Sequence, residues 1–120
     1  MLTKYIAQLT PIPVADYSRL REILHPERDP VDIHYSLAHA FVDVGESSLR
    51  HRLTTVEVYY ILSGSGVMHV AGETAEVGRG HTVVVPAGTE QWIENTNDHP
   101  LEFLCIVDPA WREQDEEILD

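Results

Sequence analysis

The sequence predicts an all-β domain arranged as an antiparallel sandwich or barrel. Short runs rich in β-branched and aromatic residues follow one another between residues 33 and 107, and they end at glycine, proline or Asn-Asp turn signals. Nothing between these runs has the spacing of an amphipathic helix, which excludes a parallel α/β fold. With 120 residues, the chain is long enough for one domain with its own hydrophobic core.

Residues 1–32 are predicted to form an N-terminal arm with one short helix. Asp16 or Ser18 can cap a helix over residues 17–24, and Pro26 ends it. Such an arm packs either on a neighbouring subunit or over its own barrel, and the sequence leaves both arrangements open.

Residues 33–108 are predicted to form the barrel itself. The first strand candidate is the longest. The strand candidates cover residues 33–44, 57–62, 66–70, 74–77, 82–85, 91–94 and 101–107. Glycines at the breaks between them, such as Gly64 and Gly72, supply the positive φ angles that tight turns require.

Residues 109–120 are predicted to form an acidic C-terminal tail. Its carboxylate residues are Glu113, Asp115, Glu116, Glu117 and Asp120. A tail of this composition is expected to be solvated and partly frayed. Trp111 is placed to cover either the barrel mouth or a subunit contact.

Charge and cysteine usage narrow the functional classes. The formal net charge of −12 argues against nucleic acid and against an anionic membrane surface as partners. No apolar run approaches the roughly 18–20 residues that a membrane span needs, and the first residues lack the layout of a signal peptide. The lone Cys105 excludes an intrachain disulfide, so a cytoplasmic location is expected, with the thiol buried and inert in its strand.

Two sequence patterns with fixed spacing contain the polar residues that are candidates for a functional site. The first pattern is Gly45, five residues, His51, one residue, Leu53, three residues, Glu57, six residues, Gly64. The second pattern is Gly80, five residues, Pro86, one residue, Gly88, two residues, Gln91, three residues, Asn95. Together they resemble the paired motifs of the cupin superfamily, and the resemblance extends over about residues 33–107.

The resemblance to cupins implies a double-stranded β-helix, or jelly-roll, barrel that is commonly a homodimer. Among cupins, the chain resembles the small single-domain barrels of the mannose-6-phosphate isomerase-like type. In metal cupins the motif side chains hold one divalent ion of Fe, Mn, Ni, Cu or Zn. Carried over by position, the ligands are His51, Glu57 and Gln91, with Leu53 and Gln91 standing where the family has histidines.

Two further side chains are candidates for the same site. His39 lies on the strand that enters the first motif and can supply another imidazole to the metal. Tyr59 shares a strand face with Glu57, because side chains alternate along a strand. Its hydroxyl is therefore the candidate catalytic or substrate-positioning group.

Each candidate ligand has a structural alternative. His51 at the end of a loop is also compatible with a structural or solvated histidine, and Glu57 with a salt bridge to Arg50 or Arg52. The amide of Gln91 can hydrogen-bond a ligand or a neighbouring strand instead of a metal.

Two functional hypotheses follow from the sequence. The first is a metal-dependent enzyme of the dioxygenase or isomerase type, acting on a small oxygen-rich metabolite. The second is a metal-free binding module that recognises a sugar or small metabolite by hydrogen bonds. Retention of His51 and Glu57 favours the first, and the two replaced histidines favour the second.

Overall fold

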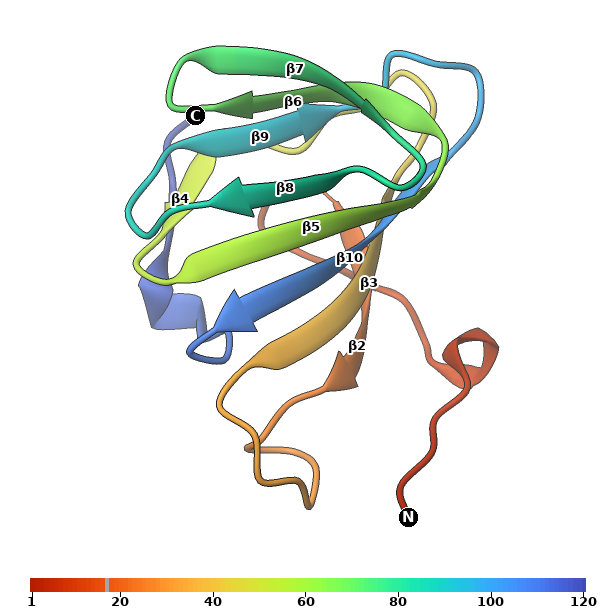
Figure 1. Ribbon diagram of the computed structural model, residues 1–120, viewed down its shortest axis with the longest axis vertical. Coiled ribbons are helices and arrows are strands. Elements are labelled where there is room, and N and C mark those ends of the chain that lie inside the picture. Colours follow the sequence, from red (N-terminus) through yellow and green to blue (C-terminus); the bar gives the residue numbers. More distant parts are fainter. Residues whose placement is uncertain (17) are drawn as a thin grey trace.

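Two facing β-sheets make up the protein (Figure 1), and the computed structural model describes residues 1–16 and 18–120. The first sheet contains, in spatial order, β1 (Ile12–Pro13), β2 (Arg19–Leu24), β3 (Ser36–Val42), β10 (Leu101–Asp108), β5 (Val56–Ser63) and β8 (Thr82–Val85). The second sheet contains β11 (Glu116–Ile118), β4 (His51–Leu53), β9 (Gln91–Glu94), β6 (Ser65–Val70) and β7 (Glu73–Gly78). The prediction of an all-β barrel is confirmed.

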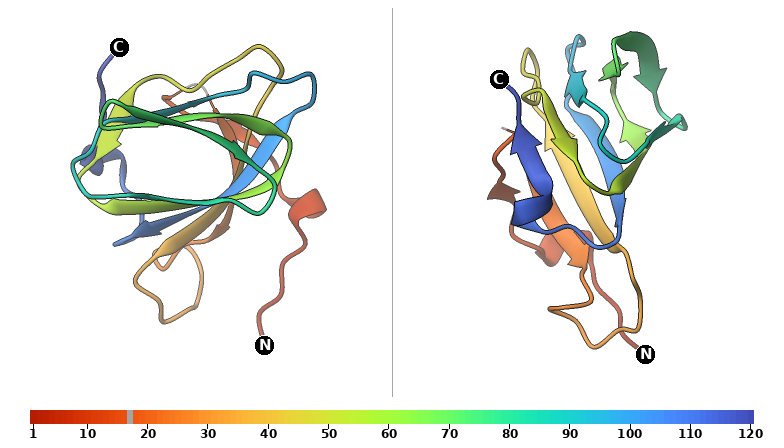
Figure 2. Two further views of the ribbon diagram at one scale, coloured as in Figure 1. Left: turned by 45° about the horizontal axis from the view of Figure 1, so that its top comes forward. Right: turned by 90° about the vertical axis from the view of Figure 1, so that its left-hand side faces the viewer.

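The two sheets curve into a ring when the molecule is viewed along the barrel (Figure 2). Apolar side chains from both sheets fill part of the space between them. The core includes Ala40, Ile61, Met68, Ile93, Leu101 and Phe103. Burial of such side chains drives the two sheets together, as in other sandwiches and barrels. Among the described residues, no helix is long and apolar enough to cross a membrane.

The strands of the barrel lie close to the predicted runs. The first run is shorter than predicted, since β3 covers Ser36–Val42 rather than residues 33–44. The short strand β4 lies in a stretch that was expected to be a loop. Its three residues pair with β11, and His51 also pairs with Gln91 of β9. Neither partner is visible in the local sequence pattern.

Residues 19–24 form strand β2 instead of the predicted helix, so the helix prediction is wrong there. The Asp16 carboxylate accepts hydrogen bonds from the N–H and the hydroxyl of Ser18, which closes a turn before the strand. The edge of β3 is available for pairing, and this pairing outweighs the local helix signal. Tyr17 lies outside the described residues, and the arm contains a short 3-10 turn, η1 (Ile6–Gln8).

The acidic end of the chain also pairs with the barrel. After the 3-10 turn η2 (Glu113–Asp115), strand β11 lies antiparallel to β4, with Glu116 opposite Leu53 and Ile118 opposite His51. The expectation of a frayed and solvated tail is therefore wrong for this strand. Pairing along the edge of β4 gives the backbone groups of β11 hydrogen-bond partners in place of water.

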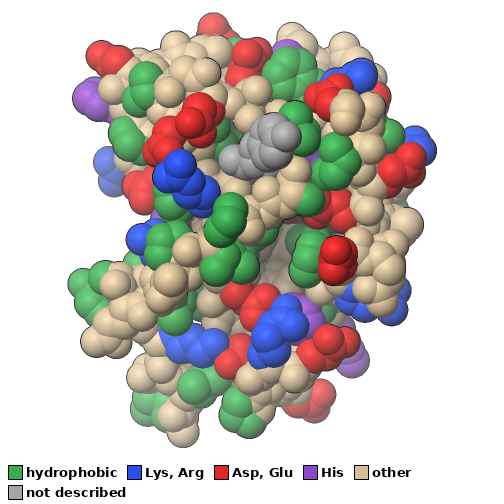
Figure 3. All heavy atoms as spheres, turned by 180° about the vertical axis from the view of Figure 1, so that it is seen from behind, with side chains coloured by type: hydrophobic (Ala, Val, Ile, Leu, Met, Phe, Trp, Pro, Cys, Tyr) green, Lys and Arg blue, Asp and Glu red, His purple; other side chains and the backbone are tan. Residues whose placement is uncertain are grey.

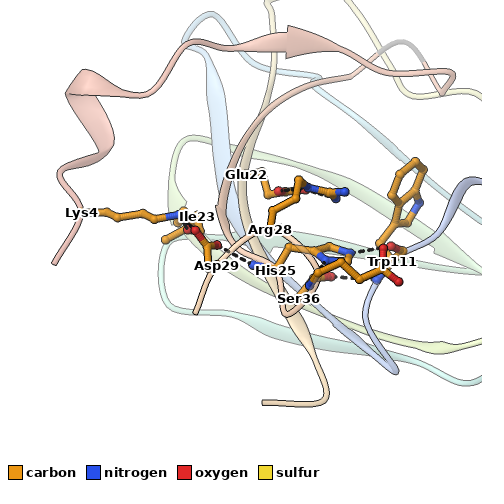
Figure 4. A network of polar contacts seen from close by, with 9 residues as sticks. Lys4, Glu22, Ile23, His25, Arg28, Asp29, Ser36 and Trp111 are labelled. Atoms are coloured by element: carbon orange, nitrogen blue, oxygen red, sulfur yellow. Dashed lines mark hydrogen bonds and ion pairs between the residues drawn. The ribbon is translucent and has the colours of Figure 1, made fainter. Parts of the chain in front are cut away.

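A polar network ties the loop after β2 to the segment after β10 (Figure 4). The buried ring of His25 donates from Nε2 to the carbonyl oxygen of Trp111 at 2.8 Å. The N–H of Trp111 donates to the Ser36 hydroxyl at 3.0 Å. Lys4 donates to the Asp29 carboxylate of the same loop at 2.7 Å. These contacts fix the position of Trp111 at one end of the barrel.

Candidate functional site

A cavity of about 130 Å³ lies between the two sheets. It is lined by side chains from β1, β2, β3, β4, β5, β9, β10 and β11, together with the turn before β2 and the segment after β10. Seen from behind, the surface is hollowed near its centre, with hydrophobic side chains around the hollow (Figure 3). The walls are mostly apolar, so the few polar groups that reach the cavity stand out.

Strand alternation selects which residues face this cavity. In β5, Glu57 and Tyr59 line it, as the sequence predicts from their spacing. The neighbouring strand β10 places Val107 opposite Glu57 and Cys105 opposite Tyr59. Because paired residues of adjacent strands point to the same side of a sheet, the four side chains form one continuous wall.

Glu57 is a carboxyl group in an apolar wall, and only 7% of the residue is exposed. Burial raises the pKa of Glu57 from about 4.5 to about 7. The His51 ring, the Gln91 amide and the Cys105 thiol lower this pKa, while the Asp16 carboxylate raises it, and burial outweighs them. No Lys or Arg forms an ion pair with Glu57 in the described part of the chain, so the predicted alternative of a salt bridge to Arg50 or Arg52 is not formed.

His51 lies on β4 and is only 2% exposed. Its Nδ1 donates to the carbonyl oxygen of Leu49 at 2.7 Å, which fixes the ring orientation. The Nε2 atom lies 3.6 Å from Oδ2 of Asp16. With Nδ1 bonded to the backbone carbonyl, Nε2 is the ring atom that faces the Asp16 carboxylate.

Gln91 joins the same group from β9, where it lies opposite His51 in the register of the two strands. Its Oε1 accepts a hydrogen bond from the Tyr59 hydroxyl. Its Nε2 is buried and has no hydrogen-bond partner among the described residues. Burial also raises the pKa of Tyr59 well above its ordinary value, with a contribution from Glu57, so the phenol stays protonated as a donor.

Three polar or aromatic groups at the cavity come from the ends of the chain. Asp16 was interpreted as a helix cap and Glu116 as part of a solvated tail, yet both line the cavity. Trp111 lies there too, and its indole N–H donates to Glu116 at 3.0 Å. The sequence left Trp111 open between the barrel mouth and a subunit contact. No local signal identifies Asp16 or Glu116, because their positions depend on where β2 and β11 pair.

The structure does not bring His39 together with His51. Its Nε2 lies 3.2 Å from the Glu102 carboxylate and its Nδ1 lies 3.4 Å from Arg21. The alternate residues of β3, Ala38 and Ala40, line the cavity instead. His39 therefore belongs to the outer face of the first sheet.

The donor set is a poor fit for the metal ion that the cupin resemblance implies. Leu53 is buried and lines the cavity, so an apolar side chain stands where the family has a ligand. The carbonyl oxygen of Gln91 already accepts from Tyr59. No cluster of three or more His, Cys, Asp or Glu residues with the spacing of a metal site occurs in the described ranges.

The arrangement is suited to proton transfer. A carboxyl group with a pKa near 7 exists in both protonation states near neutral pH, so it can either accept or donate a proton. Glu57 has such a pKa and faces a mostly apolar cavity next to a second titratable group, His51.

Comparison with known proteins gives a consistent family assignment. The pattern described as "Cupin domain" matches residues 38–107. An uncharacterised protein of Methanocaldococcus jannaschii is 40% identical over 114 residues, which cover 94% of this chain and 90% of that protein. An oxalate-binding protein of Thermotoga maritima is 39% identical over 51 residues, 42% of either chain.

A solved structure shows the same fold. The polyketide cyclase of Streptomyces resistomycificus superposes with a TM-score of 0.82 and 19% identity, covering all of this chain and 86% of the other. Identity at this level carries the fold alone. The names of these similar proteins agree on no single activity, so the residues of the cavity have to indicate the function.

Proposed function

The chain belongs to the cupin family, and on that basis we propose that its cavity binds a small organic molecule and moves a proton on it, with Glu57 as the acid–base group. The observation that carries this proposal is the position of the Glu57 carboxyl, buried in the cavity wall with no ion pair to a Lys or Arg in the described part of the chain. His51 and Tyr59 lie on the same cavity and position the ligand.

An isomerisation or elimination of water suits these groups. In an isomerisation, Glu57 as carboxylate removes a proton from one ligand atom and returns it to another, so no co-reactant is consumed. The Tyr59 hydroxyl holds the Gln91 amide. Nε2 of that amide is buried without a hydrogen-bond partner among the described residues, and in this proposal it donates to a ligand oxygen. Such a donor stabilises negative charge that develops on a carbonyl oxygen in the transition state.

A metal-dependent reaction is the alternative. His51 and Glu57 keep the spacing of the cupin motif, and Gln91 is the third candidate ligand. The buried Leu53 and the occupied carbonyl of Gln91 make this set weaker than that of a metal cupin. Elemental analysis of the purified protein, after incubation with Fe, Mn, Ni, Cu and Zn in turn, distinguishes the two. One tightly bound ion per chain, lost in both His51→Ala and Glu57→Ala, would support the metal reading.

The acid–base proposal is tested without knowing the substrate. The protein is incubated in D₂O with a mixture of small cellular metabolites, and mass spectrometry detects compounds that gain deuterium or lose water. The wild-type protein is expected to alter at least one compound, while Glu57→Gln leaves all of them unchanged. Glu76→Gln, on the exposed side of β7, is the matched control and should behave as wild type. Binding without any exchange would leave a metal-free binding module instead of an enzyme.

We also propose that the protein is a homodimer through the outer face of the first sheet. The strand registers place Ile106, Val58 and Val84 side by side across three strands. Val84 is 60% exposed and the nearby Tyr60 is 44% exposed. An apolar row of this kind on a flat sheet is suited to burial against a second copy.

A further inference from the structure

The cavity between the two sheets is larger than the spaces that protein interiors usually contain. Side chains in a core pack about as densely as an organic crystal, and spaces larger than one water molecule are few. The cavity here measures about 130 Å³, whereas one water molecule needs about 10–15 Å³ and a benzene molecule fits a cavity of about 150 Å³. Its size therefore suits a single six-membered ring.

Small side chains in one wall make the room for this cavity. The strand registers of the first sheet place Ala38, Cys105 and Tyr59 side by side on β3, β10 and β5, and all three line the cavity. Ala40 lines it too, two residues further along β3. Alanine is less common in strands than the larger Val or Ile. A larger residue at Ala38 would extend into the cavity and occupy part of it.

Aromatic side chains of the cavity wall lie on either side of this alanine. Phe103 pairs with Ala40, and its ring contacts the Tyr59 ring with centroids 5.2 Å apart. Trp111 lies near the start of β3, since its N–H donates to the Ser36 hydroxyl. Ser36 and Ala40 are four residues apart, which corresponds to about 13 Å along a strand. A flat ring in the cavity therefore lies between aromatic side chains, which favour contact with another ring.

Three hydrogen bonds hold Trp111 in place, two of them visible in Figure 4. Its N–H donates to Ser36 at 3.0 Å, and its carbonyl oxygen accepts from the buried His25 ring at 2.8 Å. Its indole N–H donates to the Glu116 carboxylate at 3.0 Å. A side chain that is already ordered loses little conformational entropy when a ligand binds. Trp111 is therefore a preorganised part of the cavity wall.

The charged groups at the cavity favour a neutral ligand. Among the described residues, no Lys or Arg lines the cavity, so an anion would lose its hydration there without a cationic partner. Three of the lining carboxylates already accept hydrogen bonds from the protein, and these are Asp16, Glu22 and Glu116. A cationic ligand would find these carboxylates already bonded. A neutral molecule meets neither cost.

We propose that this cavity binds a small neutral ring compound of about six to eight non-hydrogen atoms, whose ring packs on Ala38 between Phe103 and Trp111. The substrate class is then a single ring that carries one hydroxyl or carbonyl oxygen. The inference rests on the proposed function in placing this oxygen toward Glu57. The position and the size limit of the ring follow from the cavity wall alone.

Matched probes test the class of ligand on the wild-type protein. Benzyl alcohol is neutral, benzylammonium has the same ring and the same number of non-hydrogen atoms with a positive charge, and benzoate is an anion of similar size. The neutral 2-naphthol has a second fused ring and exceeds the cavity. Ligand-observed NMR titration measures the affinity of each probe. Benzyl alcohol is expected to bind at least tenfold more tightly than either charged probe, and 2-naphthol not to bind.

The fluorescence of Trp111 locates the bound ring. The chain has two tryptophans, and Trp92 stacks on His69 rather than lining the cavity. In Trp92→Phe, emission therefore comes from Trp111 alone. Saturation with benzyl alcohol is expected to change this emission with the same dissociation constant as the NMR titration.

A second variant fills the cavity. Ala38→Leu adds three carbon atoms to the wall and should weaken the binding of benzyl alcohol at least tenfold. Ala75→Leu is the matched control, because it makes the same substitution at an exposed position of β7 and should leave binding unchanged. Circular dichroism confirms that both variants fold. If Ala38→Leu does not fold, the comparison of benzyl alcohol with 2-naphthol on the wild type still tests the size limit.

Four results would overturn the inference. They are no binding of benzyl alcohol, equal or tighter binding of a charged probe, equal or tighter binding of 2-naphthol, and unchanged Trp111 emission at saturation. A folded Ala38→Leu that binds benzyl alcohol as wild type does would also contradict it. The two proposals fail separately. Benzyl alcohol binding without deuterium exchange on any metabolite retains the ring ligand and removes the acid–base function, whereas exchange on charged or open-chain compounds alone does the reverse.

Discussion

Glu57 illustrates how one buried carboxyl group can serve a site while destabilising the fold. The barrel places it between Val107 of β10 and Val85 of β8, and no Lys or Arg of residues 1–16 and 18–120 forms an ion pair with it. Its charged form loses the hydration that it has in the unfolded chain, and this loss raises its pKa to about 7. The group is therefore easier to protonate in the folded protein than in the unfolded one.

The pH dependence of stability follows from this pKa. Below pH 4.5, Glu57 is protonated in both states and carries no penalty. Between pH 4.5 and about 7 the unfolded chain releases its proton first, so the free energy of unfolding decreases as pH rises. The total loss is about 3 kcal/mol, since one pKa unit corresponds to about 1.4 kcal/mol. Urea denaturation at pH 5 and pH 8 is expected to show this contribution in the wild type and not in Glu57→Gln.

The difference between the two proteins isolates Glu57 from the other titratable groups. Glu57→Gln should be more stable than wild type at pH 8 and close to it at pH 5. Parallel stability profiles for the two proteins would mean that Glu57 is not desolvated as described. Glu76→Gln, at the exposed position on β7, controls for the loss of one negative charge.

Tyr59→Phe tests the hydrogen bond inside the cavity wall. The substitution keeps the ring, which contacts Phe103 with centroids 5.2 Å apart, and removes the donor to Oε1 of Gln91. A buried carbonyl without its donor should lower the free energy of unfolding by about 1–3 kcal/mol. Equilibrium denaturation at constant pH measures this loss. A change below about 0.5 kcal/mol would show that another donor, such as ordered water, replaces the hydroxyl.

At the scale of elements, the pairing of β6 with β9 depends on a residue without a side chain. A Cβ atom at Gly66 would lie 2.2 Å from the backbone carbonyl oxygen of Glu94. Gly66→Ala should therefore cost about 2–3 kcal/mol, because the strand backbone has to move. Gly78→Ala on the same hairpin is the control. Its nearest neighbours would lie at 3.7 Å, so its stability should change by less than about 1 kcal/mol. Thermal unfolding of both variants checks the contrast, and equal losses would contradict it.

The comparison between sequence and structure is clearest at this scale too. The strands between β5 and β10 are predictable because alternation and turn glycines are local signals, and Gly64 indeed has a φ of +80°. The strands β2, β4 and β11 are not predictable from local pattern. Each adds to the edge of a partner distant in sequence, and the helix signal of residues 17–24 has less weight than that pairing.

The candidate site likewise contains some residues that the sequence predicts and others that it does not. Glu57 and Tyr59 face the cavity as strand alternation predicts, and His51 does so as the motif spacing implies. Asp16 and Glu116 were not found, because they reach the cavity only once the chain ends have folded back. His39 shows what strand alternation cannot predict. Alternation says which side chains of a strand share a face, but not which face points to the cavity, and that depends on how the strand pairs with its neighbours.

At the scale of the whole molecule, the net negative charge opposes the association of two chains, whereas the apolar outer face of the first sheet favours it. Each chain carries a formal net charge of −12, so two copies repel. The row that includes Val84 and Tyr60 provides apolar surface to bury. Light scattering on a size-exclusion column is expected to show a dimer whose dissociation constant decreases as NaCl rises from 20 to 500 mM, since salt screens the repulsion.

A single charge on the outer face should separate the two subunits. Val84→Asp is expected to shift the population to monomer at micromolar concentration without loss of β-structure by circular dichroism. Arg79→Asp, in the exposed turn between β7 and β8, alters charge away from the row and is the control. A wild-type protein that is monomeric at all concentrations and salt conditions would contradict the dimer.

The cavity described above is assembled from two kinds of sequence. Strands within the matched Cupin domain region, residues 38–107, form its walls. About half of its described lining residues lie outside that region, in β1 and the turn that carries Asp16, in β2, at the start of β3, and at Trp111 and Glu116. The ends of the chain thus supply part of the cavity's chemistry, and the matched region supplies its framework. Grafting these terminal stretches onto another barrel of the family is therefore expected to change which ligand that barrel binds.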